Sequence, residues 1–338
     1  MIPRKHVIFG VLIMNMTIGI VSLSGAQSVP CIIPQPVQIA VQNGHFQVTD
    51  KTVITASGEA RFEADLLIES LAPAMGFRLK LLEQASSDTD IISLVLEPSL
   101  SESLGEEGYR LDVTPQSIRI QARKPAGLFY GIQTLRQLLP PAALSLQPVE
   151  QTQWTVPCVS INDAPHFGWR GLMLDPARHF ISLPDVKRYI DIMALHKYNR
   201  LHIHLTDEPG WRIEIKKYPE LTRIGSRMDW TELQTDTPSP DKARCVGFYT
   251  QDEIRDLVRY AARRHILIVP EIEMPAHSTA AIVSYPQLSL NAKELSALSP
   301  EQRWKAKERL LAARPQTIAF LQDVLLEVLE LFPSPWIH

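Results

Sequence analysis

The stretch Trp169–Arg212, WRGLMLDPARHFISLPDVKRYIDIMALHKYNRLHIHLTDEPGWR, decides the fold of this chain. Gly171–Leu174 is a short apolar strand that stops at Asp175, and residues 183–195 then carry apolar side chains at helical spacing. Leu201–Leu205 predicts a second strand, which ends in three polar residues. Two strands joined by a helix form a right-handed parallel unit. In a barrel of such units the active site lies at the carboxyl ends of the strands.

The same pattern continues downstream. Thr250 followed by Glu253 is a capping-box pattern at the start of a helix. Ile266–Val269 predicts a third strand, which again ends in charged residues. Thr317–Leu331 is an amphipathic helix, and Trp336–His338 has the character of the opening of a fourth strand. These units predict an α/β fold built on parallel strands.

A smaller domain precedes these units. Tyr109–Val113 and Ile118–Ala122 alternate with period two on either side of a turn, which indicates a hairpin. Strands and helices predicted around the hairpin complete an α+β pattern, and prolines crowd the region after residue 140. We expect a signal peptide over 1–26, a small α+β domain over 27–155 and a larger α/β domain over 156–338. The first barrel unit should begin near His166.

The N-terminus has the pattern of a secretory signal. Three basic residues, Arg4 to His6, precede the apolar run Val7–Leu23, and Ser24–Ala26 are small. The apolar run is interrupted by Asn15 and is shorter than the ~20 apolar residues of a membrane span. We therefore expect export to the periplasm, cell surface or exterior, with no stable membrane insertion after cleavage.

The charge and the cysteine content argue against a nucleic acid partner and against a cysteine-based framework or metal site. A formal net charge of -3, with 21% charged residues, gives no basic stripe for a nucleic acid. Cys31, Cys158 and Cys245 are far apart, so they form no disulfide framework and no metal-ligand spacing. We interpret them as isolated thiols, although any one pair could bridge outside the cell.

Four segments of the second domain have a distinctive order and spacing: WRGLMLDPARHF, KYNRLHIHLTDEPGWRIEIKKYPELTRIGS, GFYTQDEIRDLVRYAARRHILIVPEIEMPAHS and LFPSPWIH. Together they resemble glycoside hydrolase family 20, the β-N-acetylhexosaminidases. In the first domain, GYRLDVTPQSIRIQARKPAGLFYGIQTLRQLLP is similar to that family's accessory α+β domain. The resemblance implies a (β/α)8 TIM barrel, of which this chain would supply about strands one to four.

The resemblance also implies an activity. Members are exo-acting hydrolases that remove terminal N-acetylglucosamine or N-acetylgalactosamine from glycans with retention of configuration, and they need no cofactor. The mechanism is substrate-assisted: the acetamido oxygen of the sugar attacks the anomeric carbon, an Asp orients the acetamide, and the adjacent Glu protonates the leaving oxygen.

The resemblance assigns roles by position. Arg178 would bind hydroxyls at the non-reducing end of the sugar, for which a planar guanidinium is suited. Asp207 and His277 would form a hydrogen-bonded support for the catalytic Glu, and Glu273 occupies the place of an acidic substrate-binding residue. The chain departs from the family at Ala276, where Gly is usual, and at Asp207-Glu208-Pro209-Gly210, where Asp-Asp-Gln-Gly is usual.

A larger departure concerns the catalytic Asp-Glu pair, which in the family follows His-x-Gly-Gly on the fourth strand. His338 aligns with that His, so the pair is absent from the 338 residues. We expect the chain on its own to expose unpaired strand edges, to aggregate and to be catalytically inactive. A truncated hexosaminidase is the favoured interpretation.

Two alternatives stay open. One is a non-catalytic glycan-binding remnant that keeps Arg178. The other is a metal-dependent barrel hydrolase, because His202 and His204 alternate onto one face of their strand near Asp207 and His277. Strand histidines often serve only as hydrogen-bonding groups inside a barrel, so we expect no metal.

Overall fold

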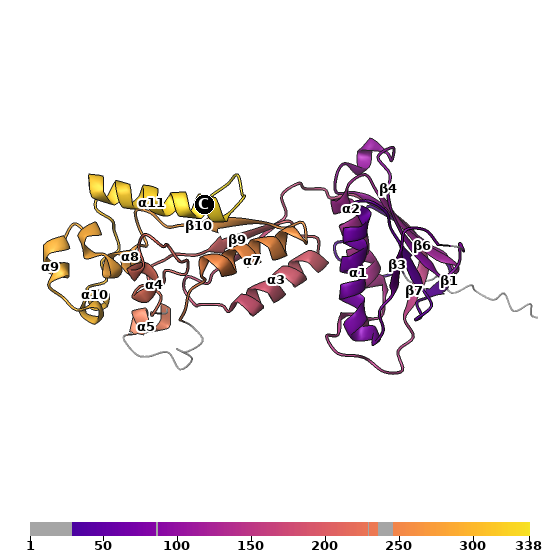
Figure 1. Ribbon diagram of the computed structural model, residues 1–338, viewed down its shortest axis with the longest axis horizontal. Coiled ribbons are helices and arrows are strands. Elements are labelled where there is room, and N and C mark those ends of the chain that lie inside the picture. The colour runs from indigo at the N-terminus through magenta and orange to yellow at the C-terminus, as the bar shows by residue number, and fades with distance from the viewer. Residues whose placement is uncertain (1–28, 86, 229, 236–245) are drawn as a thin grey trace, which may run out of the picture.

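The computed structural model describes residues 29–338, apart from residues 86, 229 and 236–245. Figure 1 shows two parts along the long axis, a sheet with two long helices at one end and a second α/β part that includes the C-terminus. The expected signal peptide and Cys245 lie outside the described residues. Cys31 is an exposed thiol and Cys158 a buried one. No helix of the described part is both long and apolar enough to span a bilayer.

A seven-stranded mixed sheet, in the order β1-β7-β5-β6-β4-β2-β3, forms the first part. Antiparallel pairing joins β1, β7, β5 and β6, and parallel pairing joins β6, β4, β2 and β3. The strands are β1 (Gln38–Gln47), β2 (Val53–Thr55), β3 (Lys80–Leu82), β4 (Ile91–Leu96), β5 (Tyr109–Val113), β6 (Ser117–Ala122) and β7 (Thr155–Asp163).

Two helices, α1 (Ala60–Met75) and α2 (Pro125–Leu138), cover one face of this sheet (Figure 1). Ile118 and Ile120 of β6 are fully buried in the resulting core, as the period-two pattern of the hairpin predicts. Gly127 and Gly131 let α2 lie close to the sheet, since a Cβ at Gly127 would meet the carbonyl of residue 108 at 2.3 Å. Short 3-10 turns, η1 (Glu102–Leu104) and η2 (Pro141–Leu144), complete this part.

The expected boundary at residue 155 needs correction. β7 begins at Thr155 and pairs antiparallel with β1 and β5, so it belongs to the sheet of the first part and not to the second part. The proline-rich segment before β7 is therefore a loop inside the accessory domain. A strand that pairs with partners some 50 and 120 residues earlier leaves no local signal of its sheet, which is why the sequence pattern misplaces it.

The second part contains a three-stranded parallel sheet in the order β10-β9-β8. The strands are β8 (Gly171–Leu174), β9 (Arg200–His204) and β10 (Leu267–Glu271). α3 (Leu183–Leu195) joins β8 to β9, and α7 (Gln251–Ala262) precedes β10. Figure 1 shows α3 and α7 side by side against this sheet. The predicted parallel strand-helix-strand unit is confirmed.

The capping box predicted at the start of α7 is also present. The Thr250 hydroxyl accepts from the Glu253 N–H at 3.2 Å, and the Glu253 carboxylate accepts from the Thr250 N–H at 2.8 Å. Further elements follow the strands: α4 (Glu220–Arg223), α5 (Trp230–Thr235), α8 (Thr279–Ser284), η3 (Pro286–Leu288), α9 (Ala292–Ser296), α10 (Pro300–Ala306) and α11 (Pro315–Leu331).

The chain after α11 returns to the edge of β10. The His338 N–H donates to the Pro270 carbonyl at 2.9 Å, and the Ile272 N–H donates to the His338 carbonyl at 3.1 Å. This is the hydrogen bonding of a parallel neighbour, so the predicted opening of a fourth strand lies in its expected place. On the opposite edge, β8 has no second strand partner within the described ranges, and Trp169 and Met173 are exposed beside it.

A polar seam joins the two parts. Lys197, in the turn between α3 and β9, contacts the Asp163 carboxylate at 2.9 Å and the Tyr109 hydroxyl at 2.8 Å. Glu107 of the accessory domain accepts from Arg170 at 2.7 Å and from Asn199 at 3.0 Å. The residues that the second part contributes lie at the amino-terminal ends of β8 and β9, opposite the edge where the predicted site residues gather.

Candidate active site

The carboxyl ends of β8, β9 and β10 bring together all four residues that the sequence analysis singled out. Because the three strands are parallel, the loops that follow them lie at one edge of the sheet. Arg178 follows β8, Asp207 follows β9, and Glu273 and His277 follow β10. The three loops are far apart in sequence, but the fold brings these four residues into a single cluster.

Arg178 is held by two carboxylates. Its Nη1 contacts Asp175 Oδ2 at 2.7 Å and its Nη2 contacts Asp207 Oδ2 at 2.8 Å. The Arg178 N–H also donates to Asp175 Oδ1 at 3.1 Å, which fixes the backbone where the side chain leaves it. Burial acts against the charge of the guanidinium, yet the hydrogen bond to Asp175 and the charge of Asp207 raise its pKa. The side chain remains 37% exposed, so the fixed head group reaches solvent.

Asp207 is the buried centre of the cluster. Its side chain is fully buried, and its Oδ1 lies 3.1 Å from His277 Nδ1 and accepts from the Glu208 N–H at 2.6 Å. His277 has a φ of +48° and its side chain is 47% exposed. The structure thus places Asp207 and His277 within hydrogen-bond distance, with the imidazole between the carboxylate and solvent. Their catalytic role stays a prediction from the resemblance.

Glu273 lies at the same edge but does not contact Arg178 directly. Its backbone N–H donates to the Thr206 hydroxyl at 2.9 Å, and its Oε1 lies 3.5 Å from His204 Nε2. The side chain is about one quarter exposed. A carboxylate in this position can accept hydrogen bonds from hydroxyl groups of a ligand that also contacts Arg178.

Sequence reasoning gave no role in the sugar site to two members of the cluster, Asp175 and His204, and considered His204 only as a metal ligand or a hydrogen-bonding group. Asp175 Oδ1 lies 3.2 Å from His204 Nδ1, and the His204 side chain is buried. Burial by itself would raise the pKa of Asp175, but hydrogen bonds from His204 and Arg178 lower it to about 2. The signals were present, since Asp175 ends the first strand and His204 ends the second.

Arg212 donates hydrogen bonds to the backbone of the loops that form the site. This fully buried guanidinium donates to the carbonyls of Pro176 and Ala177, beside Arg178, and to those of Ser226 and Met228, at 2.6 to 3.1 Å. Gly210 makes room for it, because a Cβ there would lie 2.3 Å from the guanidinium carbon. The departure from the family motif at Glu208-Pro209 leaves this packing in place.

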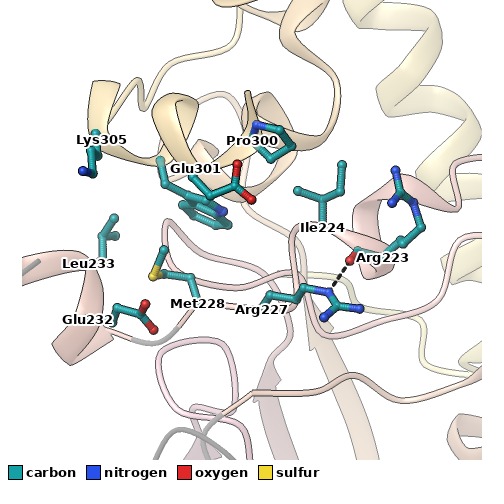
Figure 2. Close-up of a pocket in the computed structure, with 10 residues that line it drawn as sticks. Arg223, Ile224, Arg227, Met228, Glu232, Leu233, Pro300, Glu301 and Lys305 are labelled. Carbon is teal, nitrogen blue, oxygen red and sulfur yellow. Dashed lines mark hydrogen bonds between the residues drawn. The ribbon is translucent and has the colours of Figure 1, made fainter. Parts of the chain in front are cut away.

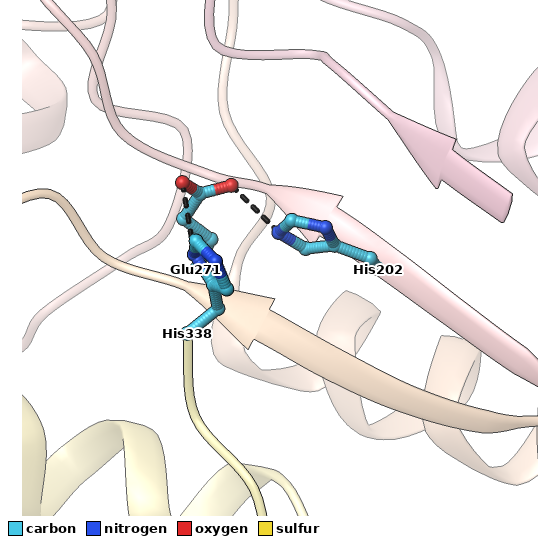
Figure 3. Close-up of side chains that lie close together, drawn as sticks. All are labelled: His202, Glu271 and His338. Carbon is cyan, nitrogen blue, oxygen red and sulfur yellow. Dashed lines mark hydrogen bonds and ion pairs between the residues drawn. The ribbon is translucent and has the colours of Figure 1, made fainter. Parts of the chain in front are cut away.

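Several His and carboxylate side chains are close enough to touch one metal ion. Figure 3 shows Glu271 between His202 and His338, with His202 Nε2 at 2.7 Å from Oε2 and His338 Nδ1 at 3.1 Å from Oε1. Each contact has the length of an N–H···O hydrogen bond. The arrangement is complete as a hydrogen-bonded group, and the expectation of a metal-free site stays a prediction.

A separate pocket of about 480 Å³ lies between α4, α5 and α10 (Figure 2). Trp304 and Met228 form part of its apolar wall, and Arg223, Arg227 and Lys305 border it. Figure 2 shows the Arg227 guanidinium turned to the Arg223 carbonyl, which accepts from it at 2.7 Å. Neither Arg178 nor Asp207 lines this pocket. The residues that the sequence analysis singled out therefore lie at the strand ends and not in this pocket.

Comparisons with known proteins match both parts of the chain. Residues 167–338 match the model of the glycosyl hydrolase family 20 catalytic domain, and residues 29–164 match that family's domain 2. A beta-hexosaminidase of Porphyromonas gingivalis is 41% identical over 309 residues, which are 91% of this chain and 38% of the relative. A beta-hexosaminidase of Vibrio furnissii is 37% identical, over 91% of this chain and 48% of the relative.

Solved structures give the same result. The Streptomyces plicatus N-acetyl-beta-hexosaminidase in complex with Thio-NAglucal superposes with a TM-score of 0.78 at 38% identity, covering 91% of this chain and 58% of that one. The beta-N-acetylhexosaminidase from Bacteroides fragilis gives a TM-score of 0.74 at 34% identity, covering 92% and 56%. This chain spans roughly two fifths to three fifths of these relatives. Because family models match both of its parts, the chain belongs to glycosyl hydrolase family 20.

Proposed function

We propose that this chain supplies the part of a β-N-acetylhexosaminidase site that binds the non-reducing end of a terminal N-acetylglucosamine or N-acetylgalactosamine. The observation that carries the proposal is the fixed and partly exposed guanidinium of Arg178, held between Asp175 and Asp207 at the carboxyl ends of the strands. An immobilised guanidinium binds paired hydroxyls with little further loss of side-chain entropy.

The reaction would follow from the rest of the cluster. Asp207 and His277, 3.1 Å apart, would orient and tune an adjacent general acid from the fourth strand. The acetamido oxygen of the sugar would form a bond to the anomeric carbon as the glycosidic bond breaks and the acid protonates the leaving oxygen. Water would then open the cyclic intermediate, and the configuration would be retained.

The Asp-Glu pair that performs these steps in the family is not among the 338 residues. The proposal therefore assigns sugar binding to these residues and hydrolysis to the protein that also contains the pair. Support comes from a Streptomyces plicatus beta-hexosaminidase, 38% identical, whose structure is a complex with its product N-acetylglucosamine. A glycan-binding remnant without catalysis would share the binding step only.

Calorimetric titration of the purified chain with the methyl β-glycoside of N-acetylglucosamine tests the proposal. We expect saturable binding that Arg178→Ala weakens by about ten-fold or more, the loss for a charged hydrogen-bonding group. The matched control is Arg255→Ala on α7, which removes an exposed arginine that pairs with Asp252 and not with Asp175 or Asp207. No binding by the unaltered chain, or equal binding by both variants, would contradict the proposal.

We further propose that the protein is exported, on the strength of its basic N-terminus, apolar run and small residues before position 27. N-terminal sequencing of the protein from its own cells is the test. A mature terminus near residue 27 supports export, and an intact Met1 on cytoplasmic material contradicts it.

A further inference from the structure

His204 is a buried member of the site and has no role in the proposed reaction. It ends β9 on the same face as Glu271, its register partner on β10. Its ring is 3% exposed and lies among carboxylates that follow all three strands. Nδ1 is 3.2 Å from Asp175, and Nε2 is 3.5 Å from Glu273 and 3.9 Å from Asp207.

The same two aspartates hold Arg178. Asp175 uses Oδ1 toward His204 and Oδ2 toward Arg178, whereas Asp207 presents Oδ2 to both. The four side chains form a closed ring in which two groups that can carry positive charge alternate with two carboxylates. Arg178 is the member exposed to solvent, and His204 is the member at the base.

The proton count of the imidazole follows from this geometry. A neutral imidazole has one N–H donor and one lone pair, so either tautomer would direct a lone pair at a carboxylate. Neither ring nitrogen forms a well-aligned hydrogen bond in the structure, but both face carboxylates, so a doubly protonated ring has favourable charge on both sides. Burial by itself would lower the pKa of His204, but the neighbouring Asp175, Glu271 and Asp207 raise it.

The charges around the ring agree with this state. Asp175, Asp207, Glu271 and Glu273 face His204 from the three strands and their loops, and Arg178 is the cation nearest to them. His277 contacts the far oxygen of Asp207, and His202 contacts Glu271. A neutral His204 would leave this buried group with an excess of negative charge.

We propose that His204 is a positioning residue that stays doubly protonated at neutral pH and holds Asp175 and Asp207 where they fix Arg178. Sugar binding by Arg178 then depends on the charge of His204. The dependence of sugar binding rests on the proposed function, whereas the protonation state of the ring does not.

The sign of the pH effect follows from the direction of the pKa shift. A histidine with a raised pKa contributes its full stabilisation below its ordinary value of 6.5. This contribution is lost as the pH rises through the higher value in the folded protein. Ligand binding should therefore weaken on the alkaline side of neutrality.

The first test observes the ring in the ligand-free chain. Long-range ¹H–¹⁵N NMR spectra of the unaltered protein, assigned through the backbone, report whether each ring nitrogen carries a proton. We expect two protonated nitrogens on His204 at about pH 7, where an ordinary histidine is mostly neutral. A single-proton tautomer at that pH would overturn the inference, whatever the chain binds.

The second test links the ring to the sugar site. Titration with the methyl β-glycoside of N-acetylglucosamine should show about ten-fold weaker binding by His204→Gln at about pH 6, and a loss of the alkaline decline. His196→Gln is the control, because it removes a histidine whose ring faces the Ile33 carbonyl and none of the carboxylates around His204. Equal pH profiles for His204→Gln and the unaltered chain would overturn the inference. If His204→Gln does not fold, the NMR result decides.

Discussion

The buried ion pair between Lys197 and Asp163 allows a quantitative prediction about the seam between the two domains. The two side chains are 7% and 11% exposed and their charged atoms are 2.9 Å apart. At an effective dielectric constant of about 20, their attraction is about 6 kcal/mol. Burial nevertheless lowers the pKa of Lys197, so desolvation offsets much of that attraction. The net contribution of the pair to the free energy of unfolding is therefore small, but the removal of one partner alone destabilises the chain.

Lys197→Met leaves the Asp163 carboxylate buried without its cation. Removing one member of such a pair typically costs 3–5 kcal/mol. The carboxylate keeps the hydroxyl of Tyr109 at 2.8 Å and the backbone N–H of Val37 at 3.2 Å, so we expect the lower end, about 3 kcal/mol. The double variant Lys197→Met/Asp163→Asn should recover most of this loss, because the amide is uncharged. Its oxygen can accept from the Val37 N–H, and its NH2 can donate to the Tyr109 hydroxyl oxygen.

Urea unfolding followed by circular dichroism measures both variants against the unaltered chain. Arg255→Met is the matched control, since it removes an exposed cation paired with Asp252 and should change the midpoint little. A cost for Lys197→Met no larger than the control's would refute the reasoning. So would a double variant that is less stable than the single one.

Three further predictions concern the site and its scaffold. Arg212→Met should destabilise the chain by at least about 3 kcal/mol, because the carbonyls it serves become unpaired, and a midpoint in urea within error of the unaltered chain would contradict this. Thr250→Ala should cost about 1 kcal/mol through loss of the capping box of α7, whereas Thr250→Ser should cost less than half of that, as thermal unfolding can show. Asp175, with its pKa lowered to about 2, stabilises the fold above its ordinary value of 3.8 and loses this contribution as the pH falls through about 2. The difference in melting temperature between Asp175→Asn and the unaltered chain should therefore shrink with falling pH, and a constant difference would count against the ion-paired site.

Local patterns in the sequence were sufficient to predict the parallel sheet and to predict that polar residues lie at its edge. Parallel strands must end at one edge, so Arg178, Asp207 and His277 could be placed together before any coordinates existed. The capping box of α7 was equally clear, because its two residues are three positions apart.

Local patterns could not predict contacts between segments that are far apart in sequence. β7 was placed in the wrong domain because its partners, β1 and β5, lie far away in sequence. The pairing of Lys197 with Asp163 crosses the two domains and has no sequence signal. His204 was interpreted as a strand histidine that fills hydrogen bonds, and only the distances to three carboxylates show its place at the base of the Arg178 ring.

The proton NMR signal of the released sugar tests the central claim most directly. Protein that contains the catalytic Asp-Glu pair together with this chain is mixed with the p-nitrophenyl β-glycoside of N-acetylglucosamine, and the anomeric proton is followed before mutarotation. The account predicts that the β-anomer appears first, and that Arg178→Ala abolishes its release while Arg255→Ala does not. First appearance of the α-anomer, or release that survives in Arg178→Ala, would contradict it.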